Sequence, residues 1–162
     1  MALYNARPDI VPSGFISNLV GILLINMEKF QSFASLVNMV LQRSLLSFYV
    51  DNKKNPTKER DIRDRVQIFR QIFFMNLPEL CGFMESNEIF PEDYFIEWMM
   101  SLFTSSFNID LVMRIWDVYF IEGFKAVYLA SIALLKYFHL KIRDFHFFKE
   151  INIKYLFLYF NY

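Results

Sequence analysis

The sequence predicts an all-α protein, a multi-helix fold, and three observations lead to that prediction. Apolar side chains recur at steps of three and four residues along most of the chain, which is the spacing of one helix face. Only 4 Gly and 5 Pro occur in 162 residues, which leaves little material for the many turns of a β protein. No segment shows the strict alternation of apolar and polar residues that a half-buried strand requires.

The first half of the chain contains three candidate helices. Residues 14–27, GFISNLVGILLINM, are almost wholly apolar. Residues 28–43 follow, and we expect one helical face to contain Phe30, Phe33, Ala34, Val37 and Val40. After a polar segment at 51–60, predicted to be an exposed loop, residues 61–75 form an amphipathic pattern that Pro78 should end. Its apolar face contains Ile62, Val66, Phe69 and Phe73.

Two further helices have recognisable boundaries. Pro91 suits the first position of a helix, and acidic residues follow it where the helix dipole is positive. The buried face of this helix should contain Phe95, Trp98, Met99, Leu102 and Phe103. Asn108 is a good N-cap for the next helix, which has Asp110 in its first turn and should end at Gly123.

Charge and cysteine content exclude several classes of protein. The 17 basic and 17 acidic residues balance to a formal net charge of zero, so no overall field attracts nucleic acid. The single cysteine, Cys81, cannot form an internal disulfide, which suits a reducing compartment. The polar N-terminus, MALYNARPDI, does not resemble a signal peptide. We therefore expect a cytoplasmic protein without nucleic-acid partners.

The apolar stretches at 14–27 and 126–140 raise the possibility of a membrane protein. Both are shorter than the roughly 18 to 20 uninterrupted apolar residues that cross a bilayer. Ser17, Asn18 and Asn26 interrupt the first, and Lys136 and His139 interrupt the second. We expect buried core helices and no transmembrane segment.

Most motifs that carry chemistry are missing from the sequence. Glycine occurs only at positions 14, 21, 82 and 123, so no Gly-rich phosphate-binding loop can be written. His139 and His146 are not four residues apart, which is the helical spacing that lets two imidazoles share a metal ion. We expect no metal, no cofactor and no independent catalytic site; a pair of His and Cys brought together in space is the one alternative left open.

The stretch from Leu111 to Gly123, LVMRIWDVYFIEG, places three unusual residues close together. Arg114 is four residues from Asp110 and three from Asp117, so the three can share a helix face. Trp116 should point into the apolar side of the same helix with Met113 and Phe120. We expect a helix that packs through its Trp and orients its Arg through local ion pairs.

At these residues the sequence resembles the TBC domain, which is found in GTPase-activating proteins for Rab GTPases. RIWDVYFIEG resembles the family's R-[ILV]-W-D-x-[FY]-[FL]-x-[DE]-G signature, and NLPELCGFM resembles its P-x-L segment. IFPEDYFIEWMMSLF is similar to the family's I-x-P-x-x-Y-x-x-x-W-x-x-x-x-F helix. Its matching residues are Ile89, Pro91, Tyr94, Trp98 and Phe103. RPDI and NLVGILLINMEKFQSFASLVNMV are similar to the segment around the Y-x-Q-G-M motif.

The resemblance covers roughly residues 5–145 and implies the C-terminal two thirds or so of a TBC domain. We therefore expect residues 1–145 to be a partial domain whose N-terminal portion is absent, and residues 146–162 to be an atypical tail. The tail is either a genuine helix or an error in the deduced coding sequence. In this family Arg114, Trp116 and Asp117 would be mainly structural.

The family is understood to insert an Arg from an I-x-x-D-x-x-R motif and a Gln from Y-x-Q-G-M into the site of GTP hydrolysis. No I-x-x-D-x-x-R occurs in this chain. An ungapped match places Gly14 at the Gln position, and a shift of one residue places Ser13 there. Neither side chain can orient a water as a glutamine amide does, so no catalytic residue is expected.

Three functions follow from these observations. The chain is part of a Rab GTPase activator, truncated or divergent and without activity alone, or it is a catalytically inert GTPase-binding or scaffolding module. The third, from another class, is a hydrophobic membrane-associated helical protein. For the first two the resemblance implies a Rab GTPase as partner, through which a cytoplasmic protein would be recruited to endomembranes in vesicle trafficking.

Overall fold

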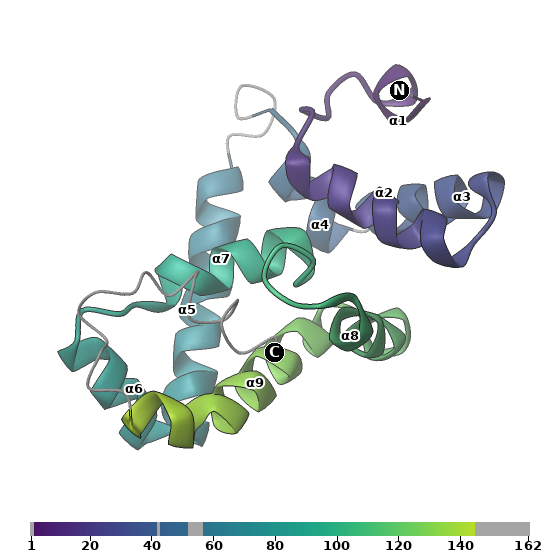
Figure 1. The fold of residues 1–162 in the computed structure, drawn as a ribbon. Coiled ribbons are helices and arrows are strands. Elements are labelled where there is room, and N and C mark those ends of the chain that lie inside the picture. The colour runs from purple at the N-terminus through teal and green to yellow at the C-terminus, as the bar shows by residue number, and fades with distance from the viewer. Residues whose placement is uncertain (1, 42, 52–56, 145–162) are drawn as a thin grey trace. The chain divides into compact units, whose positions relative to one another are not determined.

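The computed structural model describes residues 2–41, 43–51 and 57–144, which are largely helical (Figure 1). Every named element in this described part is an α-helix, apart from an isolated antiparallel bridge between Ile10 and Val50. The all-α prediction is confirmed. Two compact units divide between Asp64 and Arg65, within helix α5. The helices are α1 (Ala2–Ala6), α2 (Gly14–Asn26), α3 (Lys29–Leu41), α4 (Arg43–Tyr49), α5 (Lys58–Asn76), α6 (Pro78–Ser86), α7 (Pro91–Ser101), α8 (Ile109–Glu122) and α9 (Lys125–Asp144).

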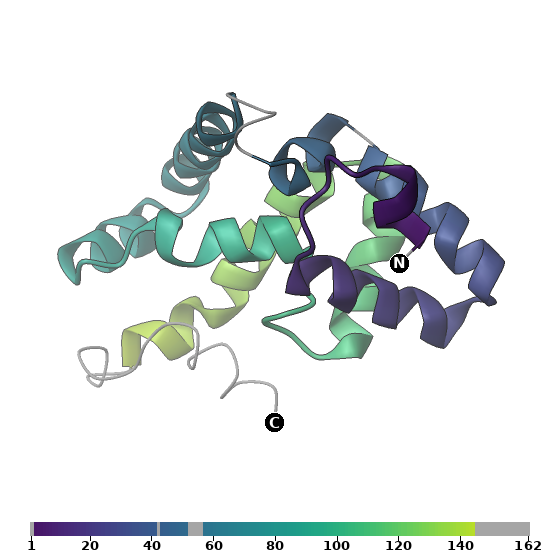
Figure 2. The same ribbon diagram turned by 90° about the horizontal axis from the view of Figure 1, so that it is seen from above.

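In the first unit, α2 and α3 form a helical hairpin whose two arms lie side by side in both views (Figures 1 and 2). The face that α3 buries differs in part from the predicted one: Val40 is buried as predicted, but Phe30 is 81% exposed and Phe33 is 37% exposed. The buried residues of α3 are Ser32, Leu36, Met39 and Val40. Apolar residues occur on more than one side of α3, so spacing alone did not identify the side that packs on α2 and α4.

In the second unit, α5 buries the predicted apolar face through Val66, Phe69 and Phe73. Its first residue is Lys58, so the end of the segment predicted to be a loop is helical, and residues 52–56 lie outside the described ranges. The helix ends before Pro78 as predicted. Pro78 itself begins α6, a short helix that the sequence analysis did not anticipate, because proline is well suited to a first helical position.

Helix α7 begins at Pro91 as predicted, and the Phe90 N–H donates to the Asp93 carboxylate over 2.8 Å. It ends at Ser101, earlier than predicted, because Leu102 (φ 47°) and Phe103 (φ 69°) adopt left-handed backbone conformations. Both of those residues are still buried. A left-handed residue cannot continue a right-handed helix, so the helix ends here although the two side chains remain in the core.

Helix α8 has both of its predicted ends. The Asn108 side-chain oxygen accepts a hydrogen bond from the Leu111 N–H over 3.0 Å, and Gly123 follows the last turn at φ 66°. Helix α9 packs against α8 and also against α7 (Figure 2). No helix within the described ranges has the length and the apolar content needed to span a membrane. The predicted atypical tail at 146–162 lies outside those ranges.

Candidate functional site

Trp116 fastens α8 to the end of α7. Its side chain is 3% exposed, and its indole Nε1–H donates a hydrogen bond to the Leu102 carbonyl oxygen over 3.0 Å. Leu102 is the left-handed residue that follows α7. A buried N–H without an acceptor would cost about 1 to 3 kcal/mol, so this carbonyl satisfies a group that the apolar core could not. The expected packing role of Trp116 is confirmed.

Three of the other signature residues lie in the same core. Pro91, Tyr94 and Trp98 are all buried. The Trp98 ring lies 5.0 Å from the ring of Tyr94 and 5.4 Å from that of Phe107, measured between centroids. Burial raises the pKa of the Tyr94 phenol, so this group stays neutral at ordinary pH. The chemistry of these residues is therefore packing, since none of them presents a charged or nucleophilic atom.

Arg114 and Asp117 are both exposed on α8. The expected ion pairs are absent: in the described part of the chain, Arg114 forms no salt bridge with Asp110 or Asp117. Exposed ion pairs contribute only about 0 to 1 kcal/mol, so spacing on a helix does not ensure that they form. Arg114 instead lines an open groove of ≈ 270 Å³ between α8 and α9, with Ile115, Val118, Ala126, Leu129, Ala130 and Ala133.

The segment before α2 is held by its backbone. The Val11 N–H donates to the Tyr49 carbonyl over 2.8 Å, and the Asp51 N–H donates to the Asp9 carbonyl over 3.1 Å. On this segment Arg7 makes a two-point contact with Asp9, with Nε–Oδ1 and Nη2–Oδ2 distances of 2.8 and 2.6 Å. The hydrogen bond to Asp9 raises the pKa of Arg7, whose guanidinium is paired with this neighbouring carboxylate.

The two candidates for the Gln position lie at the start of α2. Ser13 is the N-cap, and its hydroxyl accepts a hydrogen bond from the Phe15 N–H over 3.2 Å. Gly14 is the first helical residue, and a Cβ added there would meet no atom within 4 Å. The position is therefore open to solvent and has room for a longer side chain.

The described residues do not support metal binding or nucleophilic catalysis. No group of three or more His, Cys, Asp and Glu side chains within them could hold a metal ion. Cys81 is buried, and this burial raises the pKa of its thiol, which leaves little thiolate for nucleophilic attack. His139 is only partly buried on α9, and His146 lies outside the described ranges.

Two arginines that the sequence analysis did not single out hold helices of the second unit together. Arg70 of α5 forms salt bridges with Glu85 of α6 at 3.4 Å and with Glu92 of α7 at 2.9 Å. Arg65 of the same helix lies over the Phe124 ring, 4.1 Å from its centroid. Neither contact could have been found by spacing, because the partners are at least 15 residues apart in the sequence.

Residues 5–143 match the family model described as the Rab-GTPase-TBC domain. The chain belongs to this family. Over 133 residues, or 82% of the chain, it is 27% identical to TBC1 domain family member 14 from Homo sapiens and 29% identical to Drainin from Dictyostelium discoideum. It is 25% identical to TBC1 domain family member 12 from Xenopus tropicalis over 131 residues, or 80% of the chain.

The aligned region is a small part of these relatives, amounting to 18% of the human protein, 29% of Drainin and 18% of the Xenopus protein. The chain is thus a Rab-GAP-type TBC domain by family, and this family regulates Rab GTPases. The activities of the much longer relatives do not transfer with the alignment.

Proposed function

We propose that this chain binds a Rab GTPase through its TBC fold and does not, by itself, accelerate GTP hydrolysis. The proposal rests mainly on the residues at the start of α2, where the family's water-orienting Gln would lie. Ser13 there is engaged in capping the helix, and Gly14 has no side chain. The bound GTPase would therefore receive no amide to position the attacking water.

The second part of the proposal concerns the arginine. An arginine supplied in trans can raise the rate of GTP hydrolysis by about 10³ to 10⁵, because it balances charge that develops on the phosphates. No I-x-x-D-x-x-R motif occurs in the sequence. Arg7, the arginine nearest to the start of α2 in the sequence, is paired with Asp9 at two points and would have to leave that carboxylate to act.

Binding does not require either the Arg or the Gln, since a few central residues carry most of the affinity of an interface. We therefore favour a regulator that lacks an independent catalytic site, located in the cytoplasm and recruited to endomembranes through the GTPase. A catalytically inert scaffold is the second candidate, and the same exposed Gly14 is compatible with it.

Single-turnover GTP hydrolysis tests the proposal. A panel of GTP-loaded Rab proteins is measured with and without the chain, and binding to the same proteins is measured by biolayer interferometry. We expect at least one Rab to bind while its hydrolysis rate stays unchanged. A rise of about tenfold or more, equivalent to about 1.4 kcal/mol of barrier, would overturn the inactive assignment. Absence of binding to every Rab would instead favour the scaffold.

A further inference from the structure

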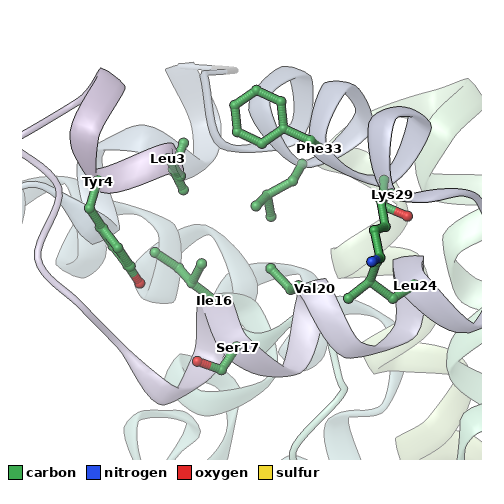
Figure 3. A pocket seen from close by; sticks show the side chains of 10 residues that line it. Leu3, Tyr4, Ile16, Ser17, Val20, Leu24, Lys29 and Phe33 are labelled. Carbon is green, nitrogen blue, oxygen red and sulfur yellow. The ribbon is translucent and has the colours of Figure 1, made fainter. Parts of the chain in front are cut away.

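A groove in the first compact unit is bounded by α1 and by the α2–α3 hairpin (Figure 3). It has a volume of ≈ 320 Å³. Four of the side chains that line it are at most 5% exposed and form its floor, namely Leu3, Ile16, Ser32 and Leu36. A hollow with a mostly apolar floor and a few polar groups is the usual form of a small-molecule site, and such sites have volumes from about 300 Å³ upward.

The polar groups of this groove differ in whether they are already engaged. The buried Ser32 hydroxyl donates a hydrogen bond to the Met27 carbonyl oxygen over 3.2 Å. Lys29 forms no salt bridge in the described part of the chain, and the neighbouring Glu28 does not line the groove. Of the residues that do line it, only Lys29 is charged, and its side chain lies at the opposite end from Tyr4 (Figure 3). One end of an apolar groove therefore has a positive charge without an acidic partner.

Charge complementarity identifies the head group of the ligand as an anion. Lys29 is the first residue of α3, where the helix dipole is positive, so the dipole and the ammonium group favour the same sign of charge. A cationic ligand would be repelled, and an uncharged one would gain no ion pair from Lys29. A carboxylate would accept a charge-assisted hydrogen bond from the ammonium group, and such bonds are roughly twice as strong as neutral ones.

The volume limits the rest of the ligand to a short chain. A water molecule occupies about 30 Å³ in the liquid and a methylene group is of similar size, so ≈ 320 Å³ holds on the order of ten such groups. A protein partner would bury about 800 Å² on each side, which is more than a groove of this size supplies. Val20 and Phe33 add apolar walls to the floor, and these favour hydrocarbon, because each methylene group gains free energy on leaving water.

We propose that this groove binds the anion of a medium-chain fatty acid, with about ten carbon atoms. Its carboxylate pairs with Lys29 at the start of α3, and its chain lies along the apolar floor between α1 and the α2–α3 hairpin. The inference goes beyond the proposed function, because it requires neither a GTPase nor hydrolysis. A ligand in this position contacts α1, α2 and α3 together, so it stabilises the folded first unit.

Equilibrium dialysis with radiolabelled decanoate tests the proposal, at about pH 7.5, where a carboxylic acid is ionised. We expect saturable binding of one decanoate per chain, with a dissociation constant on the order of 100 μM for a ligand of this size. Decan-1-ol has the same chain length without the charge, and we expect it to bind about tenfold more weakly because it forms no ion pair.

Three variants locate the ligand in the groove. Lys29→Met removes the charge from an exposed position, and it should weaken decanoate binding by about tenfold while leaving decan-1-ol binding unchanged. Lys136→Met removes an equally exposed charge on α9, outside the groove, and is the matched control that should bind decanoate as wild type does. Val20→Trp places an indole in the groove and should weaken the binding of both ligands by about tenfold or more.

Several results would overturn the proposal. Absence of saturable decanoate binding is the first. Equal losses in Lys29→Met and Lys136→Met would mean that general surface charge attracts decanoate. Unchanged binding by a folded Val20→Trp variant would place the ligand elsewhere, and decan-1-ol that binds as tightly as decanoate would exclude the anionic head group. Circular dichroism confirms that each variant is folded.

Discussion

The indole Nε1–H of Trp116 donates a hydrogen bond to the carbonyl oxygen of Leu102 over 3.0 Å, inside the core of the second unit. This contact gives the signature Trp a physical role, because it joins the middle of α8 to the turn that ends α7. The turn itself depends on two non-glycine residues with positive φ, Leu102 and Phe103. Left-handed conformations cost about 1 to 2 kcal/mol per residue, so the core must hold them in place.

Two substitutions separate the packing of Trp116 from its hydrogen bond. Trp116→Ala should lower the free energy of unfolding by about 3 to 5 kcal/mol, as a large core side chain is lost. Trp116→Phe keeps an aromatic ring but leaves the Leu102 carbonyl without its donor, which should cost about 1 to 3 kcal/mol beyond the change in volume. Urea unfolding followed by circular dichroism measures both. A Trp116→Ala variant as stable as wild type would show that the helix is fastened elsewhere.

Local signals predicted the fold better than they predicted the contacts. Asn108, Gly123 and Pro91 mark helix ends through their own backbone chemistry, and all three predictions are confirmed. The buried face predicted for α3 was right at Val40 but wrong at Phe30 and Phe33, which fit a helix spacing as well as the true core residues do. Which side is covered depends on neighbouring helices, and no local pattern contains that information.

The predictions for the candidate site were also right for burial and wrong for contacts. The sequence placed Trp116 in the core, and the structure agrees. It also predicted ion pairs for Arg114, which do not form with Asp110 or Asp117 in the described residues. The acceptor of Trp116 was not predictable, because Leu102 carries no residue-type signal for a left-handed conformation. The functional roles of Ser13 and Gly14 rest on alignment with a motif and stay predictions.

Cys81 should react slowly with thiol reagents while the chain is folded. Burial, and next the charge of Glu85, raise the pKa of the thiol, so less thiolate is present than in an unfolded chain. We expect alkylation by iodoacetamide at about pH 8 to be tenfold or more slower than in urea, where the thiol has a pKa of about 8.5. Mass spectrometry measures the rate. Equal rates in both conditions would contradict the buried position.

The raised pKa of Cys81 also determines the direction in which the stability of the chain changes with pH. A raised pKa in the folded chain means that the folded state holds its proton more tightly than the unfolded state does. The contribution of Cys81 to stability is therefore complete below the unfolded thiol's pKa of about 8.5 and is lost as the pH rises through the folded value. Cys81→Ala should flatten this part of the pH dependence, as measured by urea unfolding between about pH 7 and 10.

Arg70 should stabilise the second unit modestly and in a salt-dependent manner. Its partners Glu85 and Glu92 have side chains that are 42% and 49% exposed, so each pair is worth about 0.2 to 1 kcal/mol. Arg70→Met should lose about 0.4 to 2 kcal/mol in low salt, because both pairs are removed, and the difference from wild type should shrink in about 1 M NaCl. Lys125→Met, which removes the more exposed pair with Glu122, is the control and should cost less. An Arg70→Met loss that is unchanged by salt would indicate packing by the side-chain stem instead.

Glu88 offers a position at which a substitution should stabilise the chain. It is exposed and has φ 61°, a left-handed conformation that a residue with a Cβ adopts at a cost. Glu88→Gly removes this cost but gives the unfolded chain more freedom, so we expect a net gain of about 0.5 to 1 kcal/mol. Glu88→Ala removes the same carboxylate while keeping the Cβ, and it should stay near wild type. Thermal unfolding of both variants makes the comparison, and equal stability of the two would argue against backbone strain.

The exposed first residue of α2 provides a gain-of-function test of the proposed inactivity. A Cβ added at Gly14 meets no atom within 4 Å and the position is exposed, so Gly14→Gln should fold as well as wild type. If Gly14 occupies the Gln position, the new amide can orient water at the phosphate of a bound Rab, and hydrolysis should rise about tenfold, or 1.4 kcal/mol of barrier. Gly14→Ala adds bulk without an amide and should stay at the wild-type rate.

Ser13→Gln tests the alternative alignment, although losing the N-cap should cost it about 1 kcal/mol of stability. The measurement is single-turnover hydrolysis by a Rab that binds the wild-type chain. If both Gln variants bind the Rab without any increase in the rate of hydrolysis, then neither position orients the attacking water. In that case the missing glutamine is not what limits the hydrolysis rate with this chain.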